Sequence, residues 1–265
     1  MSKKPIGVFD SGVGGLTVVK KLTEVLPNEN IIYLGDTARV PYGNKSKETV
    51  TRFAVECIMF LEKFNIKLLV VACNTVSSWS LKTLKRVFSV PIIGVIEPAV
   101  KESCSKTKRL RIGVIGTKAT VTSGSYPDAI NKIDGKIKVY QKACPLFVPL
   151  VEENWLRDKS TFDIAAKYLK PLKEKGIDTL ILGCTHYPLL KDVFRAYFGD
   201  NVNIIDSSLG VSEEIKSFLE RKTLINESKK RGKIEYFVTD DPDSFKKVSN
   251  IFLNKGISVK KVNLK

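Results

Sequence analysis

Short apolar runs alternate with amphipathic segments along nearly all of this 265-residue chain, and this alternation limits the folds open to it. A brief run of β-branched and aliphatic residues between polar or glycine residues is typical of a buried strand, whereas apolar residues three and four apart indicate a helix. Strands that alternate with helices predict βαβ units, which form largely parallel sheets covered by helices on both faces. The fold class is therefore α/β, of the doubly wound kind.

The apolar runs give the expected positions of the strands. They fall near residues 6–9, 31–34, 68–72, 92–95, 112–115, 137–140, 180–182, 204–205 and 234–238. Helices are expected between most of them, and one covers residues 50–64, where the apolar face includes Cys57. A cysteine on such a face packs as a small apolar residue, so we interpret Cys57 as part of the core.

The first and second parts of the chain carry the same landmarks in the same order. "IGVFDSG" recurs as "IGVIGTK" after 106 residues (112 minus 6), and "IIYLGD" recurs as "IKVYQK" at the same offset. The dipeptide "VP" recurs after 108 residues, and Cys73 and Cys184 end two apolar runs 111 residues apart. A fixed order with a slowly growing offset predicts two domains of similar topology, related by a pseudo-twofold axis.

The tail modifies this simple division. After residue 206 the chain still has a helix pattern at 211–220, the apolar run at 234–238 and another helix that ends near Asn254. These elements exceed what the second half needs, so we expect them to return to the first. The predicted domains are residues 1–97 with 210–265, which form a discontinuous domain, and residues 98–209.

Charge and cysteine content limit the partners. The net charge is +16, from 44 basic and 28 acidic residues, but the lysines are scattered and have no interleaved aromatic residues. A solvated lysine-rich surface is therefore the interpretation, and nucleic-acid binding is not expected. Five cysteines without a C-x-x-C pair, and one histidine, exclude a typical zinc site or disulfide framework. Apart from Cys73 and Cys184, the cysteines, with Cys104 and Cys144 among them, are interpreted as structural.

The start of the chain, "MSKKPIGVFD", lacks the cleavage region of a secretory signal, and no apolar run approaches the roughly 18 residues of a membrane helix. We expect a cytoplasmic protein that does not enter a membrane.

Polar sequences follow six of the predicted strands, at the end where ligands bind to parallel sheets. They are "DSGVGG", "GDTARVPYG", "CNT", "GTKAT", "VPLVE" and "GCTHYP". "DSGVGG" lacks the last glycine of a dinucleotide fingerprint and the lysine of a P-loop. A carboxylate and a hydroxyl, Asp10 and Ser11, suit a small ligand with an ammonium group better. We expect all six sequences to face one cleft between the two domains.

The two thiols at strand ends stand just before helices, where the helix dipole is expected to lower their pKa below about 8.5. His186, the only histidine, lies two residues after Cys184 and can share its proton, and Pro188 suits a first helical turn. Opposed thiols could act as nucleophile and helper, as a redox pair, or as two acid/base groups on opposite faces of one carbon. Redox pairs are usually close in sequence and a hydrolase needs no second thiol, so we favour inversion of a stereocentre.

Taken together, "FDSGVGGL", "GDTARVPYG", "ACNTVS", "GTKAT", "VPLVE" and "GCTHYP" resemble the motifs of the glutamate racemases, within the cofactor-independent aspartate/glutamate racemase superfamily. The resemblance covers nearly the whole chain. It implies interconversion of L-glutamate and D-glutamate without cofactor or metal, D-glutamate being a precursor of bacterial peptidoglycan. It also implies an active site between two α/β domains.

The resemblance also implies which residues are catalytic and which contact the substrate. Cys73 is expected to act on the D-isomer and Cys184 on the L-isomer, with Asp10 and His186 supporting the respective thiols. Glu152 matches a further catalytic carboxylate, although neighbouring Glu153 is an alternative. The substrate contacts implied are Asp10, Ser11, Tyr42, Gly43, Asn74, Thr75, Thr117, Thr120, Thr185 and His186.

Other functions stay open at this point. Aspartate racemase of the same superfamily is the alternative, although those enzymes resemble this motif with a carboxylate where His186 stands. Some glutamate racemases also bind DNA gyrase, which makes gyrase a further candidate partner. We expect a homodimer.

Overall fold

The protein was analysed as a computed structural model that describes residues 2–264. All the predicted strands are present, and the α/β fold class is confirmed. The strands are β1 Ile6–Asp10, β2 Ile31–Gly35, β3 Leu68–Val71, β4 Ile92–Gly94, β5 Arg111–Gly116, β6 Lys138–Ala143, β7 Thr179–Gly183, β8 Asn203–Asp206, β9 Ile234–Val238 and β10 Val259–Lys261. The last of these was not predicted, because "VKK" has no apolar run and joins the sheet through its backbone pairing with β9.

Helices connect the strands. They are α1 Leu16–Val25, α2 Lys47–Glu62, α3 Asn74–Trp79, α4 Leu81–Val87, α5 Ile96–Lys106, α6 Lys118–Thr122, α7 Ser125–Ile133, α8 Phe147–Glu152, α9 Lys159–Glu174, α10 Lys191–Phe198, α11 Ser207–Arg221 and α12 Pro242–Leu253, with short 3-10 helices η1 Thr37–Arg39, η2 Tyr42–Asn44 and η3 Tyr187–Leu190. Pro188 lies in the first turn of η3, as the sequence predicts.

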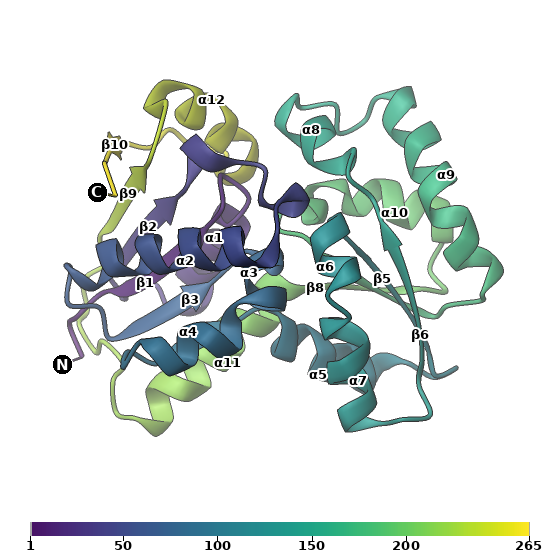
Figure 1. Ribbon diagram of the computed structural model, residues 1–265, viewed down its shortest axis with the longest axis horizontal. Coiled ribbons are helices and arrows are strands. Elements are labelled where there is room, and N and C mark those ends of the chain that lie inside the picture. The colour runs from purple at the N-terminus through teal and green to yellow at the C-terminus, as the bar shows by residue number, and fades with distance from the viewer. Residues whose placement is uncertain (1, 265) are drawn as a thin grey trace.

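The first half is built on a parallel sheet of order β10-β9-β2-β1-β3-β4. Its strand β1 lies in the middle, with Ile6 beside Ile31 of β2 and Leu68 of β3. Every residue of β1, β2 and β3 is buried, because helices cover both faces of the sheet. The tail strands β9 and β10 extend this sheet beyond β2 (Figure 1).

A second parallel sheet has the order β6-β5-β7-β8. This is the order of β2-β1-β3-β4, with each strand replaced by the one four places later. The repeat seen in the sequence therefore corresponds to two halves of the same core topology. Both cysteine strands, β3 and β7, occupy equivalent inner positions beside β1 and β5.

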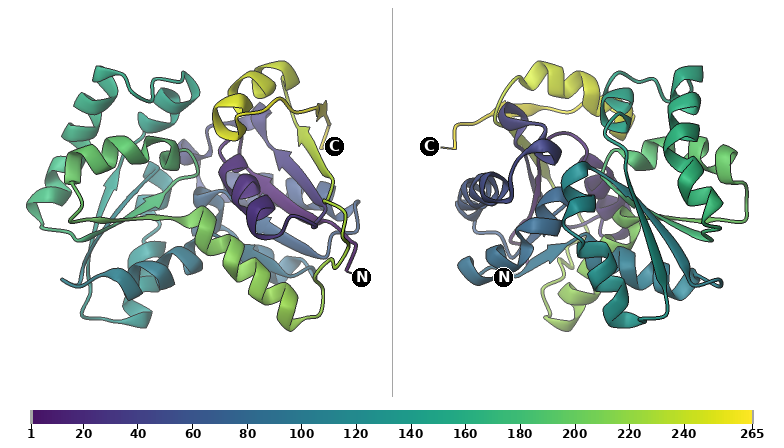
Figure 2. Two further views of the ribbon diagram at one scale, coloured as in Figure 1. Left: turned by 180° about the vertical axis from the view of Figure 1, so that it is seen from behind. Right: turned by 45° about the vertical axis from the view of Figure 1, so that its right-hand side comes forward.

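The chain passes between the two sheets at α5 and again at α11. Helix α11 packs against α1 and against α5, so it lies along both halves (Figures 1 and 2). It begins at Ser207 and not near residue 211, because the Asp206 side chain accepts a hydrogen bond from Ser208 N (2.9 Å) and caps the helix. The sequence pattern missed this turn, since it has few apolar residues. The predicted boundary at residues 209 and 210 falls within α11.

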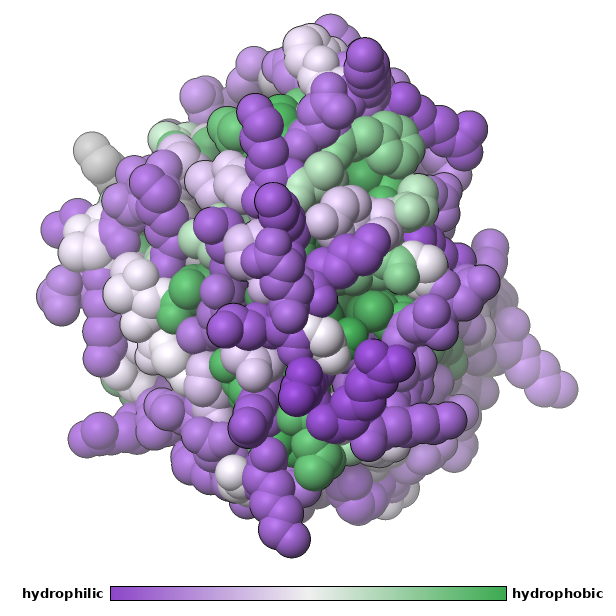
Figure 3. Space-filling model, turned by 90° about the vertical axis from the view of Figure 1, so that its right-hand side faces the viewer, coloured by the Kyte–Doolittle hydropathy of each residue, from purple (hydrophilic) through white to green (hydrophobic). Residues whose placement is uncertain are grey.

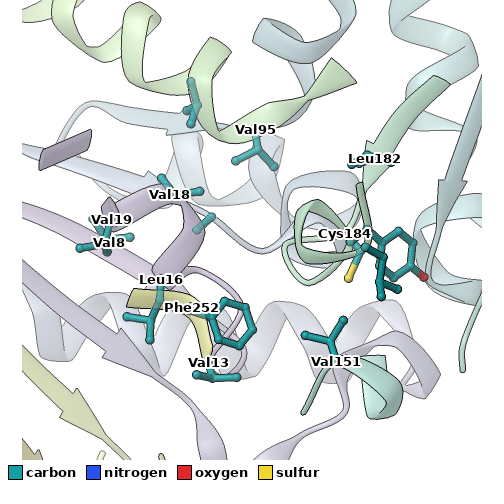
Figure 4. Packing of buried hydrophobic residues seen from close by; sticks show 14 of the residues in the cluster. Val8, Val13, Leu16, Val18, Val19, Val95, Val151, Leu182, Cys184 and Phe252 are labelled. Atoms are coloured by element: carbon teal, nitrogen blue, oxygen red, sulfur yellow. The ribbon is translucent and has the colours of Figure 1, made fainter. Parts of the chain in front are cut away.

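The interior is formed by aliphatic side chains on both sides of each sheet. One apolar cluster includes Val13 and Leu16 of the first half together with Leu182 and Cys184 of the second (Figure 4). Cys57 is fully buried on α2, as predicted. The outer face of the second half is covered mainly by hydrophilic side chains (Figure 3). None of the helices in residues 2–264 is both long and apolar enough to span a bilayer.

Candidate active site

The polar sequences at the strand ends meet at one cavity of about 480 Å³, within the range of roughly 300–1,000 Å³ typical of small-molecule sites. Parallel strands of each half bring their carboxyl ends to the edge that faces the other half, which is why segments from distant parts of the chain converge. The predicted site residues that line the cavity are Ser11, Tyr42, Gly43, Cys73, Asn74, Thr75, Thr117, Glu152, Cys184, Thr185 and His186. Asp10 and Thr120 lie behind this wall and are fully buried.

Both thiols lie on the wall of the cavity and are almost closed off from solvent. Cys73 follows β3 and precedes α3, and Cys184 follows β7; their exposed fractions are 5% and 6%. The Cys73 Sγ donates to Ser11 Oγ at 3.4 Å. Each thiol is thus held at the end of a rigid buried strand, as the sequence predicts.

The expected effect of the helix dipole on Cys73 was wrong. Burial, and after it the charge of Asp10, raises the pKa of Cys73 to about 12, although the hydrogen bonds that Cys73 shares with Ser11 and with the backbone of Val76 act in the opposite direction. Removal of the thiolate from water raises the pKa by more than the dipole of a short helix lowers it. Cys73 is therefore protonated at neutral pH when the cavity is closed.

His186 joins Cys184 to a carboxylate. Its Nδ1 lies 3.9 Å from Cys184 Sγ, and its Nε2 lies 2.8 Å from Glu152 Oε1. Burial alone would lower the pKa of His186, but the hydrogen bonds and charges of Cys184 and Glu152 raise it to about 10. The imidazole is consequently positive at neutral pH and places a positive charge beside the Cys184 sulfur.

Glu152, and not Glu153, is the carboxylate at the cavity. The Glu152 side chain reaches His186 from the C-terminal end of α8. Glu153 lies outside the cavity, in an apolar depression beside Trp155.

Asp10 stands behind the first thiol. It is fully buried, and Gly12 N donates to its Oδ2 at 2.9 Å. Burial raises the pKa of Asp10, while the charge of His186 and backbone hydrogen bonds from Gly12, Gly15 and Ser11 oppose the increase. Its carboxylate therefore orders the glycine turn after β1 and adds negative charge close to Cys73.

A chain of hydroxyl groups crosses from one half to the other at the cavity. Thr75 Oγ1 lies 3.0 Å from Thr117 Oγ1, which in turn lies 3.0 Å from Thr120 Oγ1. Thr120 thus contributes by holding Thr117. The Tyr42 ring forms part of the wall, but its hydroxyl donates to buried Asp36 and is turned away from the cavity.

Three residues that were not predicted as site residues contact Thr185 and His186, which are called the histidine segment below. Phe252 of α12 packs edge-on against His186, with ring centroids 5.5 Å apart. Thr17 Oγ1 donates to the carbonyl oxygen of Thr185 at 3.2 Å. Gly14 lies so close that a Cβ placed there would stand 2.5 Å from His186 Nδ1. These contacts join segments more than 60 residues apart, so a local pattern could not indicate the contacts, although Gly14 itself lies in the "DSGVGG" motif.

The ion pair between His186 and Glu152 makes a direct prediction. Glu152→Gln should lower the pKa of His186 from about 10 towards the ordinary value of roughly 6.5, because the amide cannot stabilise the imidazolium by charge. Since this is the only histidine in the chain, NMR titration of the imidazole reports it without assignment. Glu153→Gln is the matched control and should leave the titration unchanged. An unaltered pKa in Glu152→Gln would show that the carboxylate does not set the charge of His186.

Another groove in residues 2–264 does not contain the two thiols and the histidine. A larger groove of about 650 Å³ lies between α4 and α7, but neither thiol lines it. Within residues 2–264 no cluster of His, Cys, Asp and Glu side chains is arranged to hold a metal ion.

Known proteins share this sequence and fold. Residues 6–209 match the family described as Asp/Glu/Hydantoin racemase. The glutamate racemase of Geobacter metallireducens (strain ATCC 53774 / DSM 7210 / GS-15) is 48% identical over 253 residues, covering 96% of this chain and 94% of the relative.

Solved structures agree over the full length. Glutamate racemase isoform RacE1 from Bacillus anthracis is 39% identical, with a TM-score of 0.97, and covers 100% of this chain and 99% of that chain. Glutamate racemase from Francisella tularensis subsp. tularensis SCHU S4, in complex with D-glutamate, is 38% identical, with a TM-score of 0.93 and the same coverage. With two thiols on one cavity and these relatives, the chain belongs to the Asp/Glu/hydantoin racemase family and is an amino-acid racemase.

Proposed function

We propose that the protein interconverts L-glutamate and D-glutamate by moving a proton between the α-carbon and two thiols, Cys73 and Cys184. The observation that carries this proposal is the placement of both sulfurs on one enclosed cavity, at equivalent positions of two halves with the same topology. Glutamate as substrate is supported by the relatives, one of which is described in complex with D-glutamate.

The charges around the two thiols suit opposite tasks. Cys184 Sγ lies 3.9 Å from Nδ1 of positive His186, and we assign to this sulfur the removal of the α-proton of L-glutamate as a general base. Cys73, protonated because it is buried near Asp10, can deliver a proton to the other face of the carbon. The reverse direction uses the same groups with their protonation exchanged. The C–H bond broken on one face is thus replaced by a C–H bond formed on the other.

Charge that develops at the α-carbon must move into the adjacent carboxylate. Ser11, Thr75, Thr117 and Thr185 give the cavity wall hydroxyl groups that can donate to carboxylate oxygens. Fixed donors of this kind stabilise the charge without reorganising, which in a known oxyanion site is worth about 2.7–4 kcal/mol per donor. General acid/base transfer alone typically contributes about 10²–10⁴ in rate, so these donors supply an essential part of the catalysis.

Polarimetry of L-glutamate with the purified protein tests the proposal. The optical rotation should decay to zero without added pyridoxal phosphate or metal, including after dialysis against a chelator. Aspartate is the competing substrate, and its rotation should decay far more slowly. Faster inversion of aspartate would replace the substrate, and a constant rotation with both amino acids would remove the proposed function.

We further propose that the enzyme acts in the cytoplasm as a homodimer and supplies D-glutamate for peptidoglycan. Depletion in a growing bacterium should then be rescued by D-glutamate in the medium, and sedimentation should give twice the chain mass of 29.6 kDa.

A further inference from the structure

The short helix α3 connects the candidate site to the opposite half of the protein. Its first residue, Asn74, follows Cys73 and lines the cavity. The Asn74 side chain also has a partner outside the cavity, since its Oδ1 accepts a hydrogen bond of 2.7 Å from the hydroxyl of Tyr126. Tyr126 belongs to α7 of the second half and is fully buried.

In this hydrogen bond the Tyr126 hydroxyl donates to Asn74 Oδ1. The NH₂ group, which is the other branch of the planar amide, therefore points away from the tyrosine. That nitrogen, Nδ2, is buried and has no hydrogen-bond partner among residues 2–264. A buried donor without an acceptor is unfavourable and uncommon, and it is explained where a ligand supplies the acceptor.

We infer that Tyr126 is a positioning residue that fixes Asn74 so that its Nδ2 donates to a carboxylate oxygen of the substrate. The inference rests on the proposed function, since it assigns one donor to the glutamate carboxylates. An NH₂ group has no lone pair to offer, so the partner is an acceptor and not the substrate ammonium group. Tyr126 itself does not line the cavity, and its hydroxyl reaches the site through Asn74.

Tyr126 also lies against β7, the strand that leads to Cys184. Its ring packs against Gly183, the residue before Cys184, where an added Cβ would lie 3.2 Å from Tyr126 Cε2. The same side chain therefore contacts the strand that carries one thiol and the residue that follows the other. In this way the amide can be correctly oriented only while α3 and α7 are in contact.

Tyr126→Phe tests the inference, because it removes the hydroxyl and keeps the ring. The KM for glutamate should increase by about tenfold, while kcat decreases by less than about threefold, since a freely rotating amide weakens binding more than it affects proton transfer. Asn74→Ala should show the same change, and the double variant should be no worse than Asn74→Ala alone. An additive double variant would contradict action through Asn74.

Ser125→Ala is the matched control. Ser125 Oγ donates to the carbonyl oxygen of Ser78 at 2.7 Å, so it also joins α7 to α3 but does not touch the amide. Its KM should stay near that of the wild type; an equal increase would indicate general loosening of the two helices and overturn the inference. Asn74→Asp keeps the acceptor for Tyr126 but repels a carboxylate, so it should raise KM more than Tyr126→Phe does.

The outcomes distinguish failure of the proposed function from failure of the role proposed for Tyr126. Wild-type protein that does not racemise glutamate contradicts the proposed function, whatever the variants do. Racemisation by the wild type with an unchanged KM in folded Tyr126→Phe contradicts the role of Tyr126 alone. Circular dichroism and the unfolding temperature establish that each variant is folded.

Discussion

Cys73→Ser and Cys184→Ser should each lower the rate of glutamate racemisation by about 10²–10⁴. A serine hydroxyl is a far weaker acid than a thiol, so it neither gives up its proton to form a base nor delivers it readily. Both sulfurs lie on the same cavity with nearly equal exposure, and neither has a substitute within it. Initial rates by polarimetry measure the effect in both directions.

Cys104→Ser provides the comparison for a thiol outside the cavity. Cys104 is half-buried on α5 and does not line the site, so its replacement should leave the rate near that of the wild type. Near-normal activity in either cavity variant would contradict the two-thiol mechanism.

Heavy water gives a second readout of the same mechanism. At early times the product isomer should carry deuterium at the α-carbon while the remaining substrate stays unlabelled, because the proton that leaves and the deuteron that arrives belong to different sulfurs. Early labelling of the recovered substrate would instead indicate that one group acts on both faces.

Gly14→Ala should abolish most activity, although Gly14 itself transfers no proton. A Cβ at this position would stand 2.5 Å from His186 Nδ1 and closer still to Thr185 Oγ1, so the histidine segment must move. A displacement of about 1 Å in a catalytic group can cost about 10² in rate. Overpacking of this kind also typically destabilises a protein by about 1–3 kcal/mol. Polarimetry and thermal unfolding measure the two effects.

Gly256→Ala is the corresponding control, because nothing lies within 4 Å of the added Cβ. It should alter neither activity nor unfolding temperature. Should Gly14→Ala remain fully active, the close contact between the glycine turn before α1 and the histidine segment would not be needed to hold His186.

The strand ends were the part of the site that the sequence could reveal. Cys73 and Cys184 each end an apolar run, and the polar residues after such runs must lie at the same edge of a parallel sheet. The equal order of strands in the two sheets follows from the same repeat. Local sequence is sufficient here because the apolar run of a strand and the polar residues that follow it are both local features.

Contacts between the halves could not be predicted in this way. Phe252 and Tyr126 reach the site through packing across segments that are distant in the chain, and neither has a spacing that marks it. Gly14 lies in the "DSGVGG" motif, but its closeness to His186 also arises only in the folded chain. The raised pKa of Cys73 was missed for a related reason, since the degree of burial depends on how tightly the two halves close over the thiol.

The two halves share a topology but differ in the residues beside the sulfurs, with Asn74 and Thr75 after one and Thr185 and His186 after the other. Thermodynamics restricts what this asymmetry can achieve. Enantiomers have equal free energies in water, so the equilibrium constant of a racemisation is one, and kcat/KM must be equal in the two directions. The differences between the halves can therefore make kcat differ between the two isomers only in the same proportion as KM. An enantiomer that binds more tightly must turn over proportionately more slowly, and a substitution on one wall alters the rate constants for both isomers.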